Sequence, residues 1–568
     1  MLRTLAAVII VPLVALAGWL ALGEGRGRAD FVVTATEPRT LDPHRVSLLH
    51  EIQLAAAMFE GLTRLNAQTF QPEPAVAERW DVAPDGRTYT FHLRPDVRWS
   101  TGEPVTAEDF RAGWLRVLDP RSECQYASLL FAIRGAEAYY RARIAGVQAF
   151  SSDSVGVQAI DPRTLRVELA GPCPYFLELT SFITFVPAHR PTLERWVYRD
   201  GQVLRVTQHL WTRPGHIVCN GPFVLTRWDF KRGLWLDRNP HYWDAPDIAI
   251  DSLEVVITGD TSAALVAYET GRVDLVRWLD RPVAEALSRA RQAGRRADFR
   301  TGDRFCTFFY RVNCRRPPLD NADFRLALAL ALDRPALCEH VLRLGEAPAL
   351  TLVPPHLVHL MPRKNADGAT VYYQPPAGAG ATLSPAERVR LAREHLQRSG
   401  FGTRSPRRPI EVLVPSGDLE QRALAEAIKA MWERDLGILV EIGQVEIKVL
   451  SSRVRDLDYD LARSDWFGDY LDPSTFLGLF TTESGQNRTG WSNAEYDRLI
   501  AAAAAEQDEA RRLALYAEAE ALLCERELPI IPVFHRRGNY LLNPRFTGVN
   551  DNPRDLLQLH RARMRGSD

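Results

Sequence analysis

The chain has 568 residues, more than one hydrophobic core supports, and this length predicts two or three domains. Its 70 Lys and Arg residues balance 71 Asp and Glu residues, for a formal net charge of −1. Proteins that bind nucleic acid usually carry a basic excess, so we expect no nucleic-acid partner.

The N-terminus has the pattern of an export segment. Arg3 precedes an apolar run over residues 5–22, and the polar stretch GEGRGRAD follows it. Ala21 and Gly23 provide the small residues that a signal peptidase requires, but the run is also about long enough to span a bilayer. Residues 1–29 are therefore either a signal peptide or a membrane anchor. With either outcome, we expect the rest of the chain in the periplasm or another extracytoplasmic space.

The first half of the chain mixes strand and helix patterns. We expect strands over residues 31–35, 88–93, 155–159, 165–169, 223–229, 234–238 and 250–257. Helical spacing predicts helices over 52–62, 106–118 and 261–270. Thr106 and Asp109 form a capping box for the second helix, and Gly271 ends the third.

From about residue 385, strands and helices alternate. Before this region we expect a strand over 305–313, a helix over 324–331 and a long surface loop over 361–384. Helices follow over 385–400, 419–436, from Ser492 and over 508–526, with strands over 410–414, 438–442 and 530–534. Gly400 and Gly437 end the first two of these helices. The pattern predicts an α/β fold.

Motifs of common enzymes are missing from the sequence, which has no GxSxG, HExxH or Walker loop. His356 and His359 are too few for a metal site, and we interpret them as a surface pair. Asp456, Asp458 and Asp460 lack the glycine and glutamate of a calcium loop, so we interpret them as solvated charges at a strand edge. Seven widely spaced cysteines form no CxxC and suggest mostly buried free thiols. We therefore expect no catalytic activity, no metal and no cofactor.

One stretch, YDLARSDWFGDYLDP over residues 459–473, combines polar and aromatic groups at the end of a predicted strand. Within seven residues it presents a cation on Arg463, an aromatic ring on Trp466 and an anion on Asp469, the last in a glycine-containing bend. Taken alone, the stretch also fits an ordinary strand with a core tryptophan and a turn aspartate.

In a wider context the sequence resembles the oligopeptide-binding proteins of ABC importers, within the family of peptide, nickel and opine solute-binding receptors. The segments that carry the resemblance are LDPHR (41–45), FEGL (59–62), AVAERW (75–80), TFHLRPDVRWSTGEPVTAEDF (90–110), PYF (174–176), NGPF (220–223), RNPHYWD (238–244), ALDR (331–334) and WFGDYLDPSTF (466–476). Their order and spacing extend from about residue 31 to 545.

The resemblance implies a two-lobed periplasmic-binding-protein-like fold with an extra subdomain in the first lobe and a hinge of two crossovers. Lobe I would comprise residues 31–60 and 191–305 with a C-terminal return and tail over 534–568, the extra subdomain 61–190, and lobe II 306–533. The crossovers would be the strand from Phe305 and the segment near His535.

The resemblance also implies that a peptide lies in the cleft as an added β-strand. Its backbone would pair with Ser464, Asp465, Trp466 and Phe467 on one side and with Ser47, Leu48 and Leu49 on the other. Main-chain pairing tolerates many side chains. Asp469 would hold the ligand's α-ammonium, because a buried ammonium needs a partner. Arg463 would meet a ligand carboxylate, and Trp466 and Tyr126 would be aromatic cleft residues.

Four departures from the family pattern qualify these expectations. Trp19 stands where a lipid-bearing cysteine would be, so we expect no lipoprotein. Cys306 occupies one position of a cleft disulfide found in some relatives, but Phe467 occupies the other. Gln421 and Ile447 replace a histidine and a pocket tryptophan, which leaves peptide length and side-chain preference open.

The function that the resemblance implies is capture of oligopeptides and delivery to the permease subunits of an ABC transporter by a monomeric receptor. Two alternatives stay open: the same fold with a nickel chelate, an opine or a sugar, and a membrane-tethered peptide sensor or chaperone without a transport role. A hydrolase is the least supported hypothesis, because no nucleophile and base pair is visible.

Overall fold

The structure is a computed structural model that describes residues 27–147, 151–199, 202–203, 209–365, 367–402, 408–549 and 552–566. Its main feature is an 11-stranded mixed sheet in which ten strands follow one path and β15 pairs with β21 beside it. Along the path lie β10 (Phe223–Asp229), β11 (Gly233–Arg238), β12 (Ser252–Ile257), β1 (Phe31–Ala35), β13 (Leu275–Arg277), β21 (Ile530–Leu542), β14 (Phe299–Val312), β20 (Leu461–Phe467), β18 (Ile410–Pro415) and β19 (Val440–Val445).

The β10 end of the sheet belongs to lobe I, where β1 runs parallel to both β12 and β13. A separate four-stranded antiparallel sheet contains β4 (Ala77–Val82), β5 (Thr88–Leu93), β7 (Thr164–Glu168) and β6 (Val157–Asp161). Helix α3 (Ala107–Val117) begins with the predicted capping box, in which the N–H and hydroxyl of Thr106 donate to Asp109 at 2.8 and 2.9 Å. One continuous hydrophobic core joins this small sheet to the β10–β1 region.

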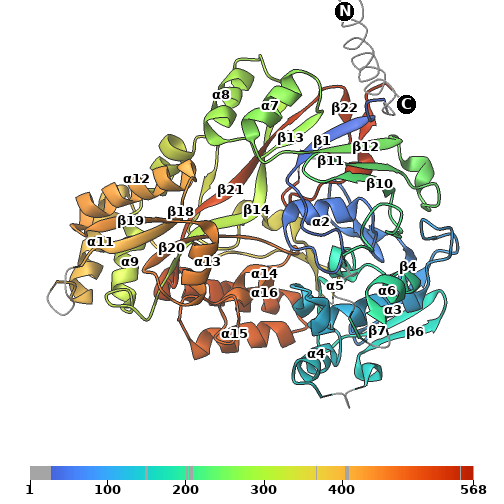
Figure 1. Cartoon of the computed structure of the whole chain (residues 1–568). Helices are drawn as coiled ribbons and strands as arrows, with labels where there is room; N and C mark the ends of the chain where they lie inside the picture. Colours follow the sequence, from blue (N-terminus) through green and yellow to red (C-terminus); the bar gives the residue numbers. More distant parts are fainter. Residues whose placement is uncertain are drawn as a thin grey trace, which may run out of the picture.

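The β19 end of the sheet belongs to lobe II, where helices surround it (Figure 1). These are α9 (Ala322–Leu330), α11 (Pro385–Ser399), α12 (Leu419–Leu436), α13 (Ile447–Arg455), α15 (Ala494–Ala505) and α16 (Glu509–Ala521). Gly400 and Gly437 end α11 and α12 in the left-handed region, at φ 72° and 65°, as the sequence predicts.

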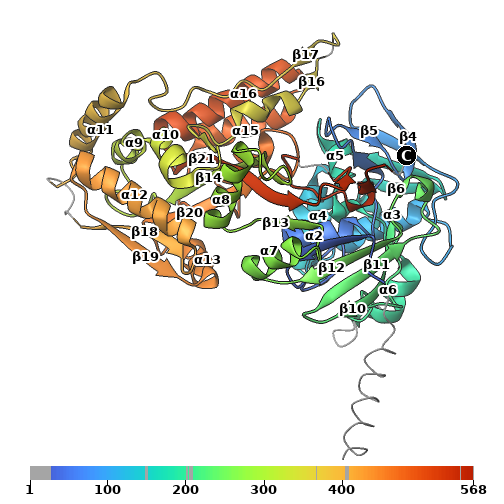
Figure 2. The ribbon, with the colours of Figure 1, turned by 90° about the horizontal axis from the view of Figure 1, so that it is seen from above.

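Two long strands, β14 and β21, pass between the two masses of the molecule (Figure 2). They pair antiparallel from Phe299 opposite Leu541 to Arg311 opposite Ile530, with a register shift between Asp303 and Thr307. The hydrophobic clusters of the two lobes meet along β21. Leu541 and Leu542 pack into clusters of lobe I, whereas Ile531 and Val533 pack into the cluster of lobe II. The residue boundaries of the lobes and of the extra subdomain stay predictions.

Several predicted elements have different ends in the structure, because hydrogen bonds from segments far away in the sequence decide where they stop. The helix predicted over 52–62 is α2 (Leu49–Ala56), because the carbonyls of Ala57 and Met58 accept hydrogen bonds from Phe223 and Gly221 instead of continuing the helix. The strand predicted over 530–534 continues to Leu542, since β13 and the first part of β14 extend its pairing.

Smaller corrections concern caps and burial. Asn493, not Ser492, caps α15 by accepting from the N–H groups of the next turn. The predicted surface loop over 361–384 contains Tyr373, which is fully buried and donates to Glu520 at 2.6 Å. Asp460 is only 2% exposed and pairs with Arg408, so it is not a solvated strand-edge charge.

The predicted export segment lies, up to residue 26, outside the described residues. Among the residues that the structure does describe, none of the helices has both the length and the apolar character needed to cross a membrane.

Candidate ligand-binding cavity

Strand β20 has one open edge beside the predicted motif. On one side it pairs with β14 along its whole length, from Leu461 opposite Val312 to Phe467 opposite Cys306. On the other side β18 reaches only Leu461 and Ala462. Within the described ranges, therefore, no strand pairs with the outer edge of residues 463–467. An unpaired edge of this kind can accept a ligand strand through main-chain hydrogen bonds.

A cavity of about 460 Å³ lies beside this edge. It is lined by Ser47, Leu48, Leu49, Ile52, Tyr126, Phe182, Asp465, Trp466, Phe467, Gly468, Asp469, Arg554 and Leu556. The structure therefore brings together eight of the ten predicted site residues from three distant parts of the chain. Arg463 and Ser464 belong to β20 but do not line the cavity.

Two further cavities lie near this one. One, of about 300 Å³, shares Leu49 with it, and its lining residues, which include Trp278, all belong to lobe I. The other, of about 630 Å³, is lined by residues 279–283 of lobe I and 416–420 of lobe II, so it lies between the lobes.

Asp469 is one of the two aspartates that line the first cavity. Its main-chain N–H donates to Thr475 at 2.9 Å, and its main-chain oxygen accepts from Arg554, so the backbone is held firmly. No described residue donates a hydrogen bond to its half-buried carboxylate. Burial raises the pKa of this carboxyl to about 6, and the charge of Arg554 opposes the rise.

Such a carboxylate is suited to a cation that arrives with the ligand. At neutral pH the carboxylate is mostly ionised. Burial removes part of its water without supplying a direct hydrogen bond, which costs free energy. A ligand ammonium would supply the missing partner. Tyr126 lies nearby, and burial together with the charge of Asp469 raises the pKa of its phenol, which keeps it neutral.

Arg463 lies outside the cavity because it is engaged in an ionic network. Its guanidinium is 3.4 Å from Asp465, which also accepts from Nε of Arg536 at 2.9 Å. Burial alone would raise the pKa of Asp465, but Arg536 and Arg463 outweigh burial and hold this pKa below its usual value. The hydroxyl of Ser464 accepts from Arg311 at 3.2 Å. Both side chains therefore support β20 through these contacts.

The aromatic residues of β20 have different surroundings. The buried Nε1 of Trp466 has no hydrogen-bond partner among the described residues. Phe467 lies edge-on to Trp278, with ring centroids 6.3 Å apart, and its backbone is opposite Cys306. Cys306 is a buried free thiol, as are four of the other six cysteines, with Cys124 and Cys314 partly exposed.

On the opposite wall, Ser47 and Leu48 precede α2, and Leu49 is its first residue. The N–H groups of Ser47 and Leu48 both donate to Glu51 at 3.3 Å, and the carbonyl of Leu48 accepts from Ile52. A ligand strand therefore finds part of the main chain at 47–49 already bonded. Leu48 itself is 42% exposed, which leaves its side chain free to contact a ligand.

Sequence reasoning did not assign five lining residues to the site: Gly468, which it placed only in the bend, and Ile52, Phe182, Arg554 and Leu556. Arg554 bonds to a residue 85 positions away in the chain, and no local pattern around it indicates that contact. The two replaced family positions lie elsewhere: Gln421 is buried at the start of α12, and Ile447 is 49% exposed at the start of α13. Over the described part of the chain, no three metal-ligating side chains gather in one place.

Comparisons with known proteins fit this arrangement. The family model for bacterial extracellular solute-binding proteins, family 5 Middle, matches residues 71–488. Over 526 residues the chain is 31% identical to the oligopeptide-binding protein OppA of Bacillus subtilis (strain 168), which covers 90% of this chain and 88% of that protein.

One further protein and one solved structure are similar to this chain over a comparable share of its length. Over 527 residues it is 31% identical to a probable deoxycholate-binding periplasmic protein, YgiS, of Escherichia coli (strain K12), covering 92% of this chain and 91% of that protein. The structure of the Escherichia coli murein tripeptide binding protein MppA matches with a TM-score of 0.78 at 28% identity, covering 94% of this chain and 98% of that one.

Proposed function

The chain belongs to the bacterial extracellular solute-binding proteins of family 5, and from this premise we propose that it captures oligopeptides between its lobes for an ABC importer. The same comparisons confirm the predicted two-lobed α/β fold and an extracytoplasmic solute-binding role. The family consists of substrate-binding receptors.

The observation that carries the proposal is the carboxylate of Asp469, which has no hydrogen-bond partner among the described residues and lies at the end of the open edge of β20. Asp469 receives the ligand's α-ammonium, and the main chain from Ser464 to Phe467 pairs with the ligand backbone. A peptide that pairs along the open edge of β20 can place its N-terminal ammonium just beyond the last paired residue, where Asp469 lies.

The remaining predicted residues take supporting roles in the proposal. Leu48, Leu49 and Tyr126 contact ligand side chains from lobe I. Trp466 uses its unpartnered indole N–H to donate to the ligand. Arg463 meets a ligand carboxylate only if it leaves Asp465, which retains Arg536 as a partner.

The test is isothermal titration calorimetry with trialanine and with N-acetyl-trialanine. We expect binding of the first and a loss of about two decades of affinity or more for the second, because acetylation removes the charge that pairs with Asp469. Equal affinity for both would overturn the role of Asp469. Binding of neither, nor of a mixture of tri- to pentapeptides, would overturn peptide capture itself.

A non-peptide ligand is a second candidate, supported by the similarity to a probable deoxycholate-binding protein. Deoxycholate carries no ammonium, so it makes no use of Asp469. Titration with deoxycholate separates the two candidates: binding of deoxycholate that survives Asp469→Asn, without binding of any peptide, would favour this one.

Delivery to the permease places the receptor at the outer face of the cytoplasmic membrane, as a monomer, with residues 1–29 as signal peptide or anchor. Fractionation with N-terminal sequencing decides between the two. A soluble protein that starts at Glu24 indicates cleavage, and a carbonate-resistant membrane protein that starts at Met1 indicates an anchor. Ligand-binding protein found in the cytosol would contradict both.

A further inference from the structure

The turn that presents Asp469 is divided between the cores of the two lobes. Tyr470 packs against the hydrophobic core of lobe I, whereas the neighbouring Leu471 belongs to a core of lobe II. From lobe II, Thr475 accepts from the N–H of Asp469 at 2.9 Å. Three further contacts reach the turn from lobe I, so both lobes determine where the carboxylate of Asp469 lies.

Two of these contacts come from the segment around α5 (Phe176–Leu179). The ring of Tyr175 stacks on Tyr470, with ring centroids 4.0 Å apart and an angle of 10° between the planes. The carboxylate of Glu178 accepts from the N–H of Leu471 at 2.8 Å. Because both ends of α5 pack in the core of lobe I, these two groups are held firmly against the turn of lobe II.

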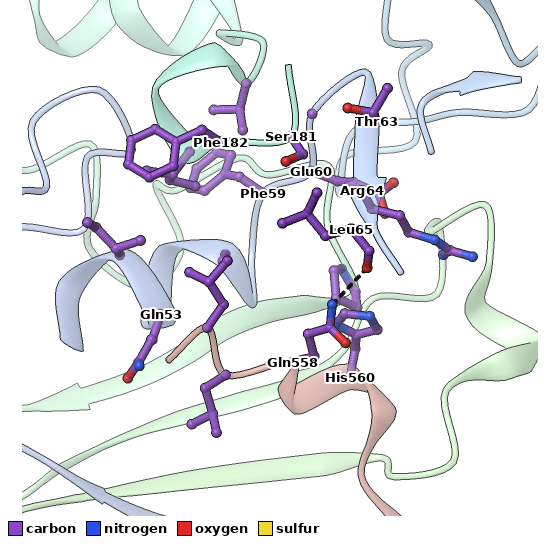
Figure 3. A pocket seen from close by; sticks show the side chains of 18 of the residues that line it. Gln53, Phe59, Glu60, Thr63, Arg64, Leu65, Ser181, Phe182, Gln558 and His560 are labelled. Carbon is purple, nitrogen blue, oxygen red and sulfur yellow. Dashed lines mark hydrogen bonds between the residues drawn. The ribbon is translucent and has the colours of Figure 1, made fainter. Parts of the chain in front are cut away.

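The third contact comes from the C-terminal return, where Arg554 donates to the main-chain oxygen of Asp469. Arg554 lines the ligand cavity and also a cavity of about 110 Å³ inside lobe I (Figure 3). In Figure 3 the ring of Phe182, from the chain after α5, lies across this cavity from Gln558 of the return. Arg554 therefore reaches the turn from the lobe I side, as α5 does.

Glu178 and Arg554 are buried groups of opposite charge, 3% and 7% exposed. Burial raises the pKa of the Glu178 carboxyl, and Arg363 and Arg554 oppose the rise. Burial lowers the pKa of the Arg554 guanidinium, and Glu178 and Asp469 oppose the fall. Two carboxylates thus act on one guanidinium, whose Nε and Nη1 have no hydrogen-bond partner among the described residues.

This balance of charge accounts for the free carboxylate of Asp469. A guanidinium forms its strongest hydrogen bonds with carboxylates, yet Arg554 bonds to the main chain of Asp469. Without the charge of Glu178, the carboxylate of Asp469 would attract Arg554 unopposed. The guanidinium would then occupy the group that the ligand ammonium needs.

We propose that Glu178 is a positioning residue: by balancing the charge of Arg554, it keeps the carboxylate of Asp469 free for the ligand ammonium. Its bond to the N–H of Leu471 holds the turn in place for the same purpose. The inference rests on the proposed function, from which it takes the role of Asp469. The ammonium site is therefore complete only where α5 of lobe I lies against the turn of lobe II.

The test is calorimetry of Glu178→Gln with trialanine and with N-acetyl-trialanine. The amide keeps an acceptor for the N–H of Leu471 but removes the charge, so Arg554 should pair with Asp469. We expect trialanine affinity to fall about tenfold and N-acetyl-trialanine affinity to stay within about threefold, because only the ammonium competes with Arg554. An equal loss for both peptides would indicate a purely structural role and overturn the proposal, as would no loss at all.

A double-mutant cycle shows whether Glu178 acts through Arg554. In an Arg554→Leu background there is no guanidinium to divert, so adding Glu178→Gln should change trialanine affinity by less than about threefold. A tenfold loss in that background would overturn the mechanism. The matched control is Glu137→Gln, an exposed residue on α4 (Ala136–Ile144), which should change neither affinity.

Folding of the variants gives an independent check on the charge pair. Removing one member of a buried pair is more destabilising than replacing both. If Glu178→Gln alone does not fold, as judged by circular dichroism, the double variant with Arg554→Leu should fold. A double variant that also fails to fold would overturn the pairing.

The outcomes distinguish this inference from the function beneath it. If the native chain prefers trialanine to its acetylated form and Glu178→Gln keeps that preference in full, the ammonium site stands and Glu178 does not position it. If the native chain binds neither peptide, the proposed function fails, and this inference fails with it.

Discussion

The guanidinium of Arg554 donates a hydrogen bond to the main-chain oxygen of Asp469, and not to its carboxylate. The C-terminal return of lobe I thus fixes the backbone of a lobe II residue while its side chain stays available. The nearby positive charge also opposes the effect of burial on the carboxyl pKa, which is about 6. Asp469 is therefore ionised at neutral pH without being neutralised by a direct partner.

Asp469→Asn tests the ammonium site directly. The amide keeps the shape of the carboxyl but removes its charge, so a bound ammonium would be left without a counter-ion. We expect a loss of about 3 kcal/mol, or about two decades of affinity for trialanine, by calorimetry. N-acetyl-trialanine should lose little, because it has no ammonium to pair.

The matched control is Glu495→Gln, an exposed carboxylate on α15. It should leave both affinities unchanged. An Asp469→Asn protein that binds trialanine like the native chain would show that the carboxylate belongs to the turn and not to the ligand.

Acidic pH should weaken binding through the same group. As pH falls through about 6, Asp469 becomes protonated in the free receptor and loses the charge that attracts the ammonium. The ligand ammonium stays protonated over this range, so affinity should fall about tenfold between pH 7 and pH 5. Titrations at half-unit steps measure this dependence. The Asp469→Asn variant should show a flat profile, and an equal acid loss in the variant would assign the effect to another group.

The local parts of the site could be predicted from the sequence. The alternating pattern before Gly468 predicts the strand that carries Trp466, and the glycine predicts the bend that places Asp469 beyond its end. The ends of α11 and α12 follow from Gly400 and Gly437 for the same reason, since a single residue decides each.

The rest depends on contacts between distant segments. Phe182 and Arg554 reach the cavity from the extra subdomain and the C-terminal return, and neither has a periodic pattern around it. The early end of α2 depends on hydrogen bonds from Phe223 and Gly221. Asp460 is buried because Arg408 reaches it from the neighbouring strand region. Local propensity contains no information about these partners.

The opposition of Cys306 and Phe467 predicts an engineered disulfide. Directly opposite residues on an antiparallel pair have Cβ atoms about 4.5–5.5 Å apart, close to what a disulfide needs after a small adjustment. Phe467→Cys should therefore form a disulfide with Cys306 on mild oxidation. Thiol counts after denaturation should fall from eight, the seven native cysteines plus one, to six.

Adding Cys306→Ser to that variant provides the control, in which seven thiols should remain after the same treatment. If oxidised Phe467→Cys alone keeps eight thiols, the two residues do not face each other as the ladder indicates. Mass spectrometry of unreduced peptides identifies the pair.

Closure of the lobes should depend on Glu420. Arg281, the first residue of α8 (Arg281–Gln292), donates through Nε to Glu420 of α12 at 2.9 Å and through Nη1 to Glu346 at 2.6 Å. The side chains of Arg281 and Glu420 are 13% and 20% exposed, so solvent screens this pair only partly. Because α8 and α12 belong to different lobes, the contact requires the lobes to approach each other.

Glu420→Gln should weaken this contact while Arg281 keeps Glu346, and so favour the open form. A partly buried pair contributes about 1 kcal/mol, which corresponds to about a fivefold shift in the ratio of closed to open receptor. Small-angle scattering should then give a larger radius of gyration without ligand and the native value with saturating trialanine. Affinity should fall by the same factor, because the ligand must now supply that free energy.

Glu426→Gln, an exposed residue on the same helix, should change neither quantity. Unchanged scattering and affinity in Glu420→Gln would mean that the Arg281–Glu420 pair does not contribute to closure, and that Arg281 acts between the lobes through Glu346 instead.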